Sequence, residues 1–322
     1  PVLEGGRVKP IDSFARNALL VIRGKQSVRM DGQTVSAVSW LLDAAFKPEA
    51  ADTYPAFAVD DPEVLGLLGL EGKSRYFAYW QIEPKRDEIQ KQASVADKQP
   101  SPRRSRFGVA VLNLDRRLTS YDRLKNTFMI SGQSDPAQEL AAFTTLLPGA
   151  MRAIHSAKPS NDDRRTLKAL AEMLRRYTFL AKIAAFKALP PKEGAPVDGW
   201  TNTGEALLRP GAGLNPHPGI ASFALMGRAY RGGDAAAFNA ALAEHSAWIV
   251  KNRPGAARLA RIETVFNKAQ PFISGIGLYL TALLLVFAAW ATRRKDAAAV
   301  ASAAAWAAVF VHTLGLLARP AL

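Results

Sequence analysis

The sequence predicts a mainly α-helical protein, with a helical domain over residues 1–268 that includes a small β-hairpin, followed by a transmembrane hairpin within 269–322. Two observations predict this architecture. The last fifty residues contain two apolar stretches, 272–292 and 297–317, each close to the ~20 residues that cross a bilayer as a helix. The preceding residues form segments in which capping residues are followed by apolar side chains at helical spacing.

The composition excludes several classes of function. The 322 residues include no cysteine, which excludes disulfides, thiolate metal sites, cysteine nucleophiles and a CxxCH haem-attachment motif. The sequence also lacks the GxSxG, HExxH and SxxK motifs of hydrolases. The net charge of +14 would suit nucleic acid, anionic lipid or an acidic partner. Because the basic residues are scattered and no nucleic-acid-binding motif accompanies them, nucleic-acid binding is not expected.

Capping and turn residues predict the first elements of the helical domain. Asp12 is expected to cap a helix that ends at Gly24. The dipeptide Asp31-Gly32, flanked by alternating residues, predicts a type I′ hairpin over 27–35.

The rest of the domain is predicted to be helical, with two irregular stretches. Residues 97–106 are rich in proline and charge and predict a mobile linker, and residues 190–219 predict a long loop. The glycines within 209–213 belong to an ordinary loop, because no strand precedes them and no Gly-Lys-Ser/Thr follows. The expected helices are 36–46, 62–68, about twenty residues from 107, 136–147, 161–189, 220–231, 234–250 and 254–268.

The connection between the two apolar stretches predicts their orientation. Residues 293–296 read Arg-Arg-Lys-Asp, and such a short basic loop is expected to stay in the cytoplasm. Residues 1–268 would then lie on the opposite side, which in a bacterium is the periplasm. Export of this domain needs an earlier signal or membrane helix, so we expect a segment of a longer chain. The alternative is a pair of buried core helices in a soluble protein.

The four histidines are the main candidates for chemistry. His155, His217 and His245 are expected on solvated surfaces, because each lies beside a loop or on a polar helix face. His312 lies in an apolar stretch, where an ionisable side chain is costly and is therefore a candidate functional residue. The alternative for His312 is an imidazole that bonds to a neighbouring helix or stays wet near the interface.

Three stretches resemble one protein family. Residues 6–16 read GRVKPIDSFAR, residues 262–285 read IETVFNKAQPFISGIGLYLTALLL, and residues 311–319 read VHTLGLLAR. Together they resemble the large periplasmic region of CcsA/ResC-type cytochrome c biogenesis proteins and the membrane helices that follow it. The middle of the chain, about 85–255, does not contribute to the resemblance.

This resemblance implies a role in system II cytochrome c maturation, in which haem is delivered across the inner membrane and attached to apocytochrome c. It implies haem as the cofactor of the intact protein and a ResB/CcsB-type membrane partner or fused domain. His312 is the one residue carried over, as a candidate axial haem ligand. The tryptophan-rich core to which the family's synthase activity is ascribed is not in this sequence, so enzyme activity of this segment stays open.

The opening segment is a candidate interface. Three cations, Arg7, Lys9 and Arg16, surround Asp12, so 6–16 is a candidate functional or partner-binding element. The alternative is a surface helix start with solvated charges, since exposed ion pairs are weak.

Two other functions remain open. The chain could be a non-catalytic, membrane-tethered periplasmic scaffold that recruits a partner. A peripheral lipid or nucleic-acid binder that uses the basic surface would show steep salt dependence of binding.

Overall fold

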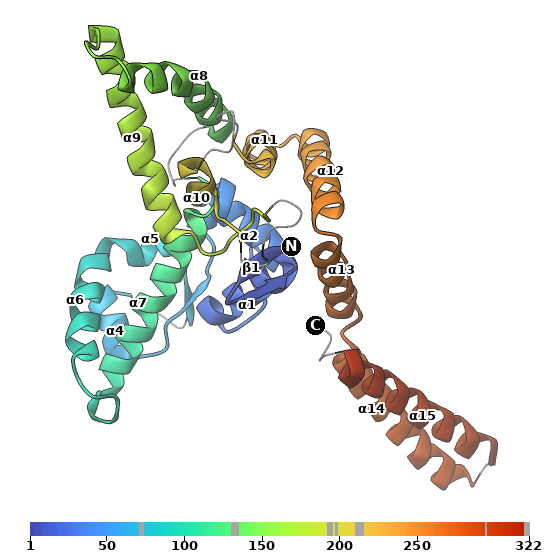
Figure 1. Cartoon of the computed structure of the whole chain (residues 1–322). Coiled ribbons are helices and arrows are strands. Elements are labelled where there is room, and N and C mark those ends of the chain that lie inside the picture. The colour runs from blue at the N-terminus through green and yellow to red at the C-terminus, as the bar shows by residue number, and fades with distance from the viewer. Residues whose placement is uncertain are drawn as a thin grey trace. The chain divides into compact units, whose positions relative to one another are not determined.

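A computed structural model describes residues 1–70, 74–129, 135–191, 196, 199–209, 216–293 and 295–318. The chain forms two compact units, Pro1–Pro254 and Gly255–Leu322. Both are mainly helical, and the strands form only short two-stranded pairs (Figure 1), which confirms the predicted fold class. The sequence places the domain boundary after residue 268, whereas the division into units places α13 (Pro254–Ala269) with the apolar helices.

The chain begins with a hairpin that the sequence analysis did not predict. Strands β1 (Val2–Glu4) and β2 (Arg7–Lys9) pair antiparallel and lead into α1 (Ile11–Arg23). The predicted cap at Asp12 is wrong. Pro10 is the N-cap residue, which places Asp12 in the first turn, where its charge still suits the positive end of the helix.

The predicted hairpin and the helix after it are confirmed. Strands β3 (Ser27–Met30) and β4 (Gln33–Ser36) pair across Asp31 and Gly32, whose φ angles of 50° and 77° fit a type I′ turn. The Ser36 side chain then caps α2 (Ala37–Phe46).

The first core of unit 1 lies between α1, α2 and α7. Aromatic side chains fill it: Trp40 is fully buried 6.1 Å from the Tyr121 ring, and Phe57 meets Tyr121 edge-on at 5.4 Å. The elements around this core are α3 (Pro48–Ala51), β5 (Phe57–Ala58) paired with β6 (Tyr76–Phe77), α4 (Pro62–Leu68), α5 (Tyr79–Ile82), α6 (Arg86–Asp97), α7 (Arg106–Lys125) and the 3₁₀ turns η1 (Glu83–Lys85) and η2 (Ser101–Arg103).

The segment predicted to be a mobile linker, 97–106, is the connection between α6 and α7. Arg104 donates hydrogen bonds to the carbonyl oxygens of Ala96, Asp97 and Gln99, at 3.0–3.2 Å, and so satisfies the free end of α6. Its mobility stays a prediction.

A second core in unit 1 joins α8 (Pro136–Ile154), α9 (Asn161–Ile183), α10 (Thr203–Leu208) and α11 (Pro218–Gly232), and α12 (Ala235–Asn252) packs on α11. Two predicted ends are wrong. Helix α8 continues past residue 147, because its later turns also bury apolar side chains. Helix α9 stops at Ile183 instead of 189, because the chain turns to an extended form and Lys187 pairs with Leu3 of β1.

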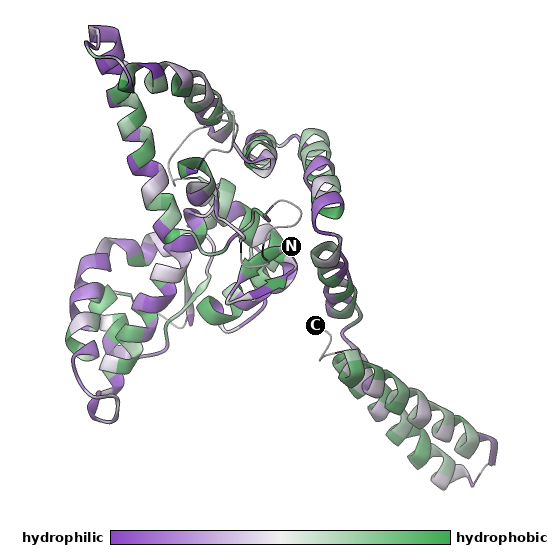
Figure 2. Ribbon diagram, viewed as in Figure 1, coloured by the Kyte–Doolittle hydropathy of each residue, from purple (hydrophilic) through white to green (hydrophobic). Residues whose placement is uncertain are grey.

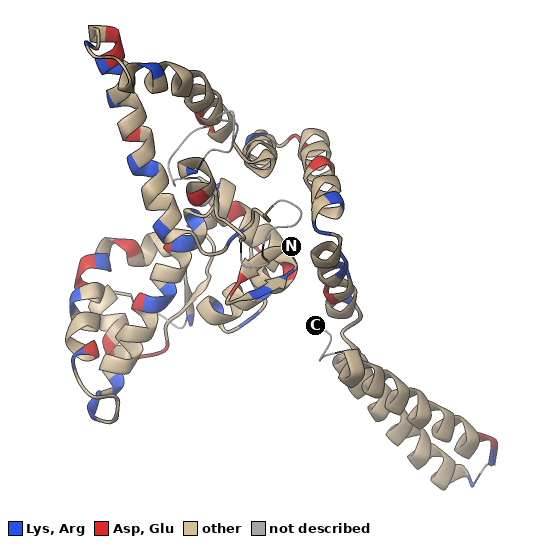
Figure 3. Ribbon diagram, in the orientation of Figure 1, with Lys and Arg blue, Asp and Glu red and all other residues tan. Residues whose placement is uncertain are grey.

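Unit 2 contains the apolar pair α14 (Pro271–Thr292) and α15 (Lys295–Ala318), preceded by α13. Gln270, at a φ of 44°, separates α13 from α14. Both apolar helices are long and hydrophobic enough to cross a membrane, and their charged residues gather at their connection (Figures 2 and 3). Arg294 of that connection lies outside the described residues.

Candidate functional site

His312 lies on the side of α15 that packs against α14. Its ring meets Phe272 edge-on at a centroid distance of 5.8 Å and Tyr279 at 6.0 Å. The two aromatic residues are seven positions apart on α14, so they face the same side of the helix and flank the imidazole. Gly275 lies between them, and a Cβ added there would be 3.9 Å from Cβ of His312, an ordinary van der Waals contact.

The large apolar side chains that lie near His312 in the sequence do not surround its ring. Phe310, Leu314 and Leu316 are 64%, 49% and 51% exposed, because they lie on other faces of α15. The apolar contacts of His312 come instead from the partner helix. Within the described residues neither ring nitrogen has a hydrogen-bond partner, so the imidazole is not held to the neighbouring helix by a hydrogen bond.

The imidazole lies near one end of the hairpin. His312 follows Lys295 by seventeen residues, which is about 25 Å along a helix. It therefore lies close to the level at which α14 begins, at the opposite end from the basic connection.

The interface candidates at the start of the chain form two separate ion pairs. Lys9 of β2 pairs with Glu4 of β1. Arg16 of α1 pairs with Asp12 one turn earlier, and its Nε lies 2.9 and 3.1 Å from the two carboxylate oxygens. Arg7 is exposed at the start of β2 and has a polar interaction of its own. Both pairs stabilise local structure, and a partner-binding role of the segment stays a prediction.

Of the three histidines expected on solvated surfaces, only His155 is exposed. His217 caps α11: its Nδ1 accepts from the Gly219 amide at 3.0 Å, so Nε2 carries the proton and donates to the Pro190 carbonyl at 2.9 Å. His245 is 6% exposed and its ring lies 4.6 Å from Phe223. The expectation for His245 is therefore wrong.

Burial keeps the His245 ring neutral. Together with smaller contributions from the amino group of Pro1 and from His217, it lowers the pKa of His245 to about 4. The ring is neutral at pH 7, and its Nδ1 has no hydrogen-bond partner.

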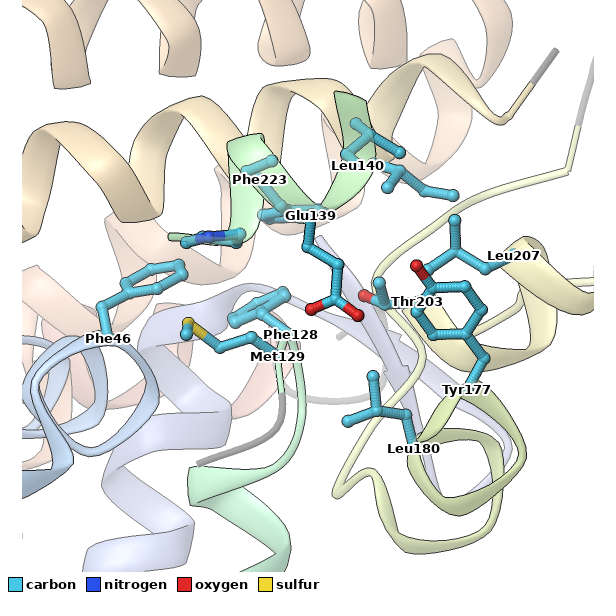
Figure 4. A pocket seen from close by; sticks show the side chains of 13 residues that line it. Phe46, Phe128, Met129, Glu139, Leu140, Tyr177, Leu180, Thr203, Leu207 and Phe223 are labelled. Atoms are coloured by element: carbon cyan, nitrogen blue, oxygen red, sulfur yellow. The ribbon is translucent and has the colours of Figure 1, made fainter. Parts of the chain in front are cut away.

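Unit 1 contains a small cavity with polar groups that no pattern in the sequence predicts. The Glu139 carboxylate and the hydroxyls of Tyr177 and Thr203 point toward one another inside it (Figure 4). Arg176 donates two hydrogen bonds to Oε1 of Glu139, at 2.9 and 3.1 Å. Apolar side chains complete the lining, among them Phe46, Phe128, Met129, Leu140, Leu207 and Phe223.

The cavity has the size of a water site. Its volume is about 30 Å³, room for roughly one or two water molecules. Water there would satisfy the hydroxyls of Tyr177 and Thr203, which are buried and have no hydrogen-bond partner among the described residues. Burial, and then the negative charge of Glu139, raises the pKa of Tyr177, so its hydroxyl stays protonated. No sequence signal marks this site, because its polar residues Glu139, Tyr177 and Thr203 come from three separate helices.

The main cluster of titratable groups in unit 1 is packed into the first core. Tyr121 donates to Oδ1 of Asp52 at 2.9 Å, Lys125 lies 3.3 Å from the same oxygen, and Tyr79 donates to Asp122 at 3.0 Å. Burial raises the pKa of Asp122 although Lys125 and Tyr79 oppose the shift. These contacts join the end of α3 and the helices α5 and α7.

Within the described ranges, no three His, Asp and Glu side chains gather in a way that would hold a metal ion. Of the loop 209–213, all but Arg209 lies outside the described residues. No protein-family model matches this chain, and no curated protein is significantly similar to it.

Proposed function

We propose that this chain is part of a membrane component of cytochrome c maturation and that His312 is an axial haem ligand of the intact protein. The observation that carries the proposal is the position of His312. In the described part of α15 that follows the basic connection, His312 carries the one ionisable side chain. Neither of its ring nitrogens has a hydrogen-bond partner within the described residues. An imidazole of this kind is a suitable ligand for haem iron, and an ionisable residue at membrane depth marks a functional site by default.

The aromatic neighbours support the same role. Phe272 and Tyr279 fix the imidazole between two rings, and they provide apolar surface of the kind that a porphyrin contacts. A second axial ligand would come from helices outside this sequence, because the other histidines belong to the helical domain. The segment by itself is therefore expected to bind haem weakly.

The proposal includes a location and partners. The hairpin spans the bacterial inner membrane with its basic connection in the cytoplasm, and residues 1–268 lie in the periplasm. There the chain acts with a ResB/CcsB-type partner or fused domain and with apocytochrome c. These assignments rest on the resemblance of residues 6–16, 262–285 and 311–319.

A second candidate for unit 1 is a non-catalytic scaffold. It is favoured by the use of the buried polar groups, which join helices: Asp43 of α2 accepts hydrogen bonds from Tyr54, at 2.7 Å, and from Tyr230 of α11, at 2.9 Å. The polar cavity beside Glu139 has room for water but not for an organic substrate. In this account unit 1 presents a surface to a partner while the haem chemistry takes place in the membrane.

The haem content of the intact protein tests the main proposal. His312→Ala should lower the haem bound to the purified protein, and added imidazole should partly restore it by filling the vacant coordination position. His155→Ala is the matched control, because His155 is an exposed histidine of the helical domain. Unchanged haem content in His312→Ala, with normal abundance, would leave the scaffold as the function of this chain.

A further inference from the structure

A groove runs between α14 and α15 near their connection, at the end of the hairpin away from His312. Its volume is about 530 Å³, which lies in the range of roughly 300–1,000 Å³ typical of small-molecule sites. Val286, Ala289 and Trp290 form the wall on α14. The wall on α15 consists of small side chains, which leave the space unfilled: Ala298, Ala301, Ser302 and Ala305.

Positive charge lies at the mouth of this groove. Arg293 and Lys295 line it, both are exposed, and neither forms an ion pair within the described part of the chain. Asp296, the acidic residue of the connection, is engaged in a polar interaction of its own. Trp290 is 81% exposed beside the two cations, and tryptophan favours the level of the lipid headgroups.

We infer that this groove binds one anionic phospholipid, with its phosphate between Arg293 and Lys295 and an acyl chain along the small residues of α15. The inference rests on the membrane position of the hairpin but not on haem binding. An apolar groove in a membrane helix pair is in contact with acyl chains, and basic residues between such helices on the cytoplasmic side select anionic headgroups. The charge at the mouth and the apolar wall below it therefore fit the two parts of the same molecule.

The test is native mass spectrometry of the full-length chain in detergent, incubated with phosphatidylglycerol or with phosphatidylcholine of the same acyl chains. Detergent removes any effect of membrane orientation. We expect one retained phosphatidylglycerol and weaker retention of phosphatidylcholine. Each cation near a headgroup contributes about fivefold in affinity. Arg293→Gln together with Lys295→Gln should therefore weaken phosphatidylglycerol about 25-fold, while Lys295→Arg should preserve it.

A matched pair of alanine substitutions tests the groove itself. Ala298→Leu fills the groove and should lower retention of both lipids, whereas Ala303→Leu adds the same side chain at an exposed position of α15 that does not line the groove. Lys268→Gln removes a cation at the end of α13 and should have no effect. Equal retention of the two lipids would overturn the inference, as would equal effects of the two leucine variants.

Discussion

The ammonium group of Lys125 lies 3.7 Å from the centre of the Tyr79 ring, with 9% of the Lys125 side chain exposed. The same ammonium contacts Asp52 at 3.3 Å and lies 3.9 Å from Asp122. A buried cation of this kind needs both a carboxylate and an aromatic face to replace its hydration. Lys125 therefore ties α7 to α3 and α5 at the centre of the first core.

Removal of this cation is predicted to destabilise the helical domain. Lys125→Met leaves the partly buried Asp52 without its cation, while Asp122 keeps Arg86 at 3.5 Å. The loss should cost about 2 kcal/mol of the free energy of unfolding. Lys91→Met is the control, because Lys91 is 73% exposed in its pair with Glu88, and its effect should stay within about 0.5 kcal/mol. Chemical unfolding of the full-length protein, followed by near-UV circular dichroism, gives both values. Equal stability of the two variants would show that the core does not depend on Lys125.

His245 predicts a pH dependence of stability. Its pKa is about 4 in the folded protein and about 6.5 in an unfolded chain. The unfolded state therefore binds more protons between these values, so the contribution of His245 is complete above pH ~7 and declines as the pH falls from ~6.5 to ~4. The loss over that window is about 3 kcal/mol at most.

Unfolding midpoints of the full-length protein across that pH range test this prediction. His245→Phe, which keeps an aromatic ring beside Phe223, should flatten the decline. His155→Phe should not, because His155 is exposed. An unchanged decline in His245→Phe would assign the pH dependence to other groups.

Gly204 is predicted to be irreplaceable where α10 meets α9. A Cβ there would lie 2.3 Å from the amide nitrogen of Ala181 and 2.5 Å from the carbonyl oxygen of Tyr177, both backbone atoms. Gly204→Ala should therefore cost about 1–3 kcal/mol or more of stability. Gly66→Ala, inside α4 with no atom near the added Cβ, should gain about 0.5–1 kcal/mol. Equal unfolding midpoints for both variants would contradict the close approach of the two helices.

Local signals in the sequence predict much of this fold. The helices predicted to begin at 62, 136 and 161 do begin there, each after a capping side chain, and the turn at Asp31-Gly32 lies where the sequence places it. Each of these signals depends on hydrogen bonds between residues a few positions apart. The early end of α9 depends instead on the pairing of Lys187 with Leu3 of β1. These residues are far apart in the sequence, so no local pattern reveals the pairing.

The candidate sites also divide into features that local sequence predicts and features that depend on contacts between distant segments. The apolar stretch around His312 marks that residue without knowledge of the fold. Its contacts with Phe272 and Tyr279 depend on how α15 packs on α14, which no local pattern in the sequence reveals. His245 lies on an alanine-rich helix, where small side chains do not show which face is buried. The cavity beside Glu139 likewise exists only where α2, α8, α9, α10 and α11 meet.

Both proposals require the hairpin to cross the membrane with its basic connection in the cytoplasm. The most direct test is a reporter that is active only in the periplasm, inserted into the intact protein either after Lys158, between α8 and α9, or after Lys295. This account predicts activity for the insertion after Lys158 and none for the insertion after Lys295. The reverse pattern would contradict the proposed orientation, and activity at both positions would contradict the membrane hairpin itself. Either result would remove the basis of the roles proposed for His312 and for the groove beside Arg293.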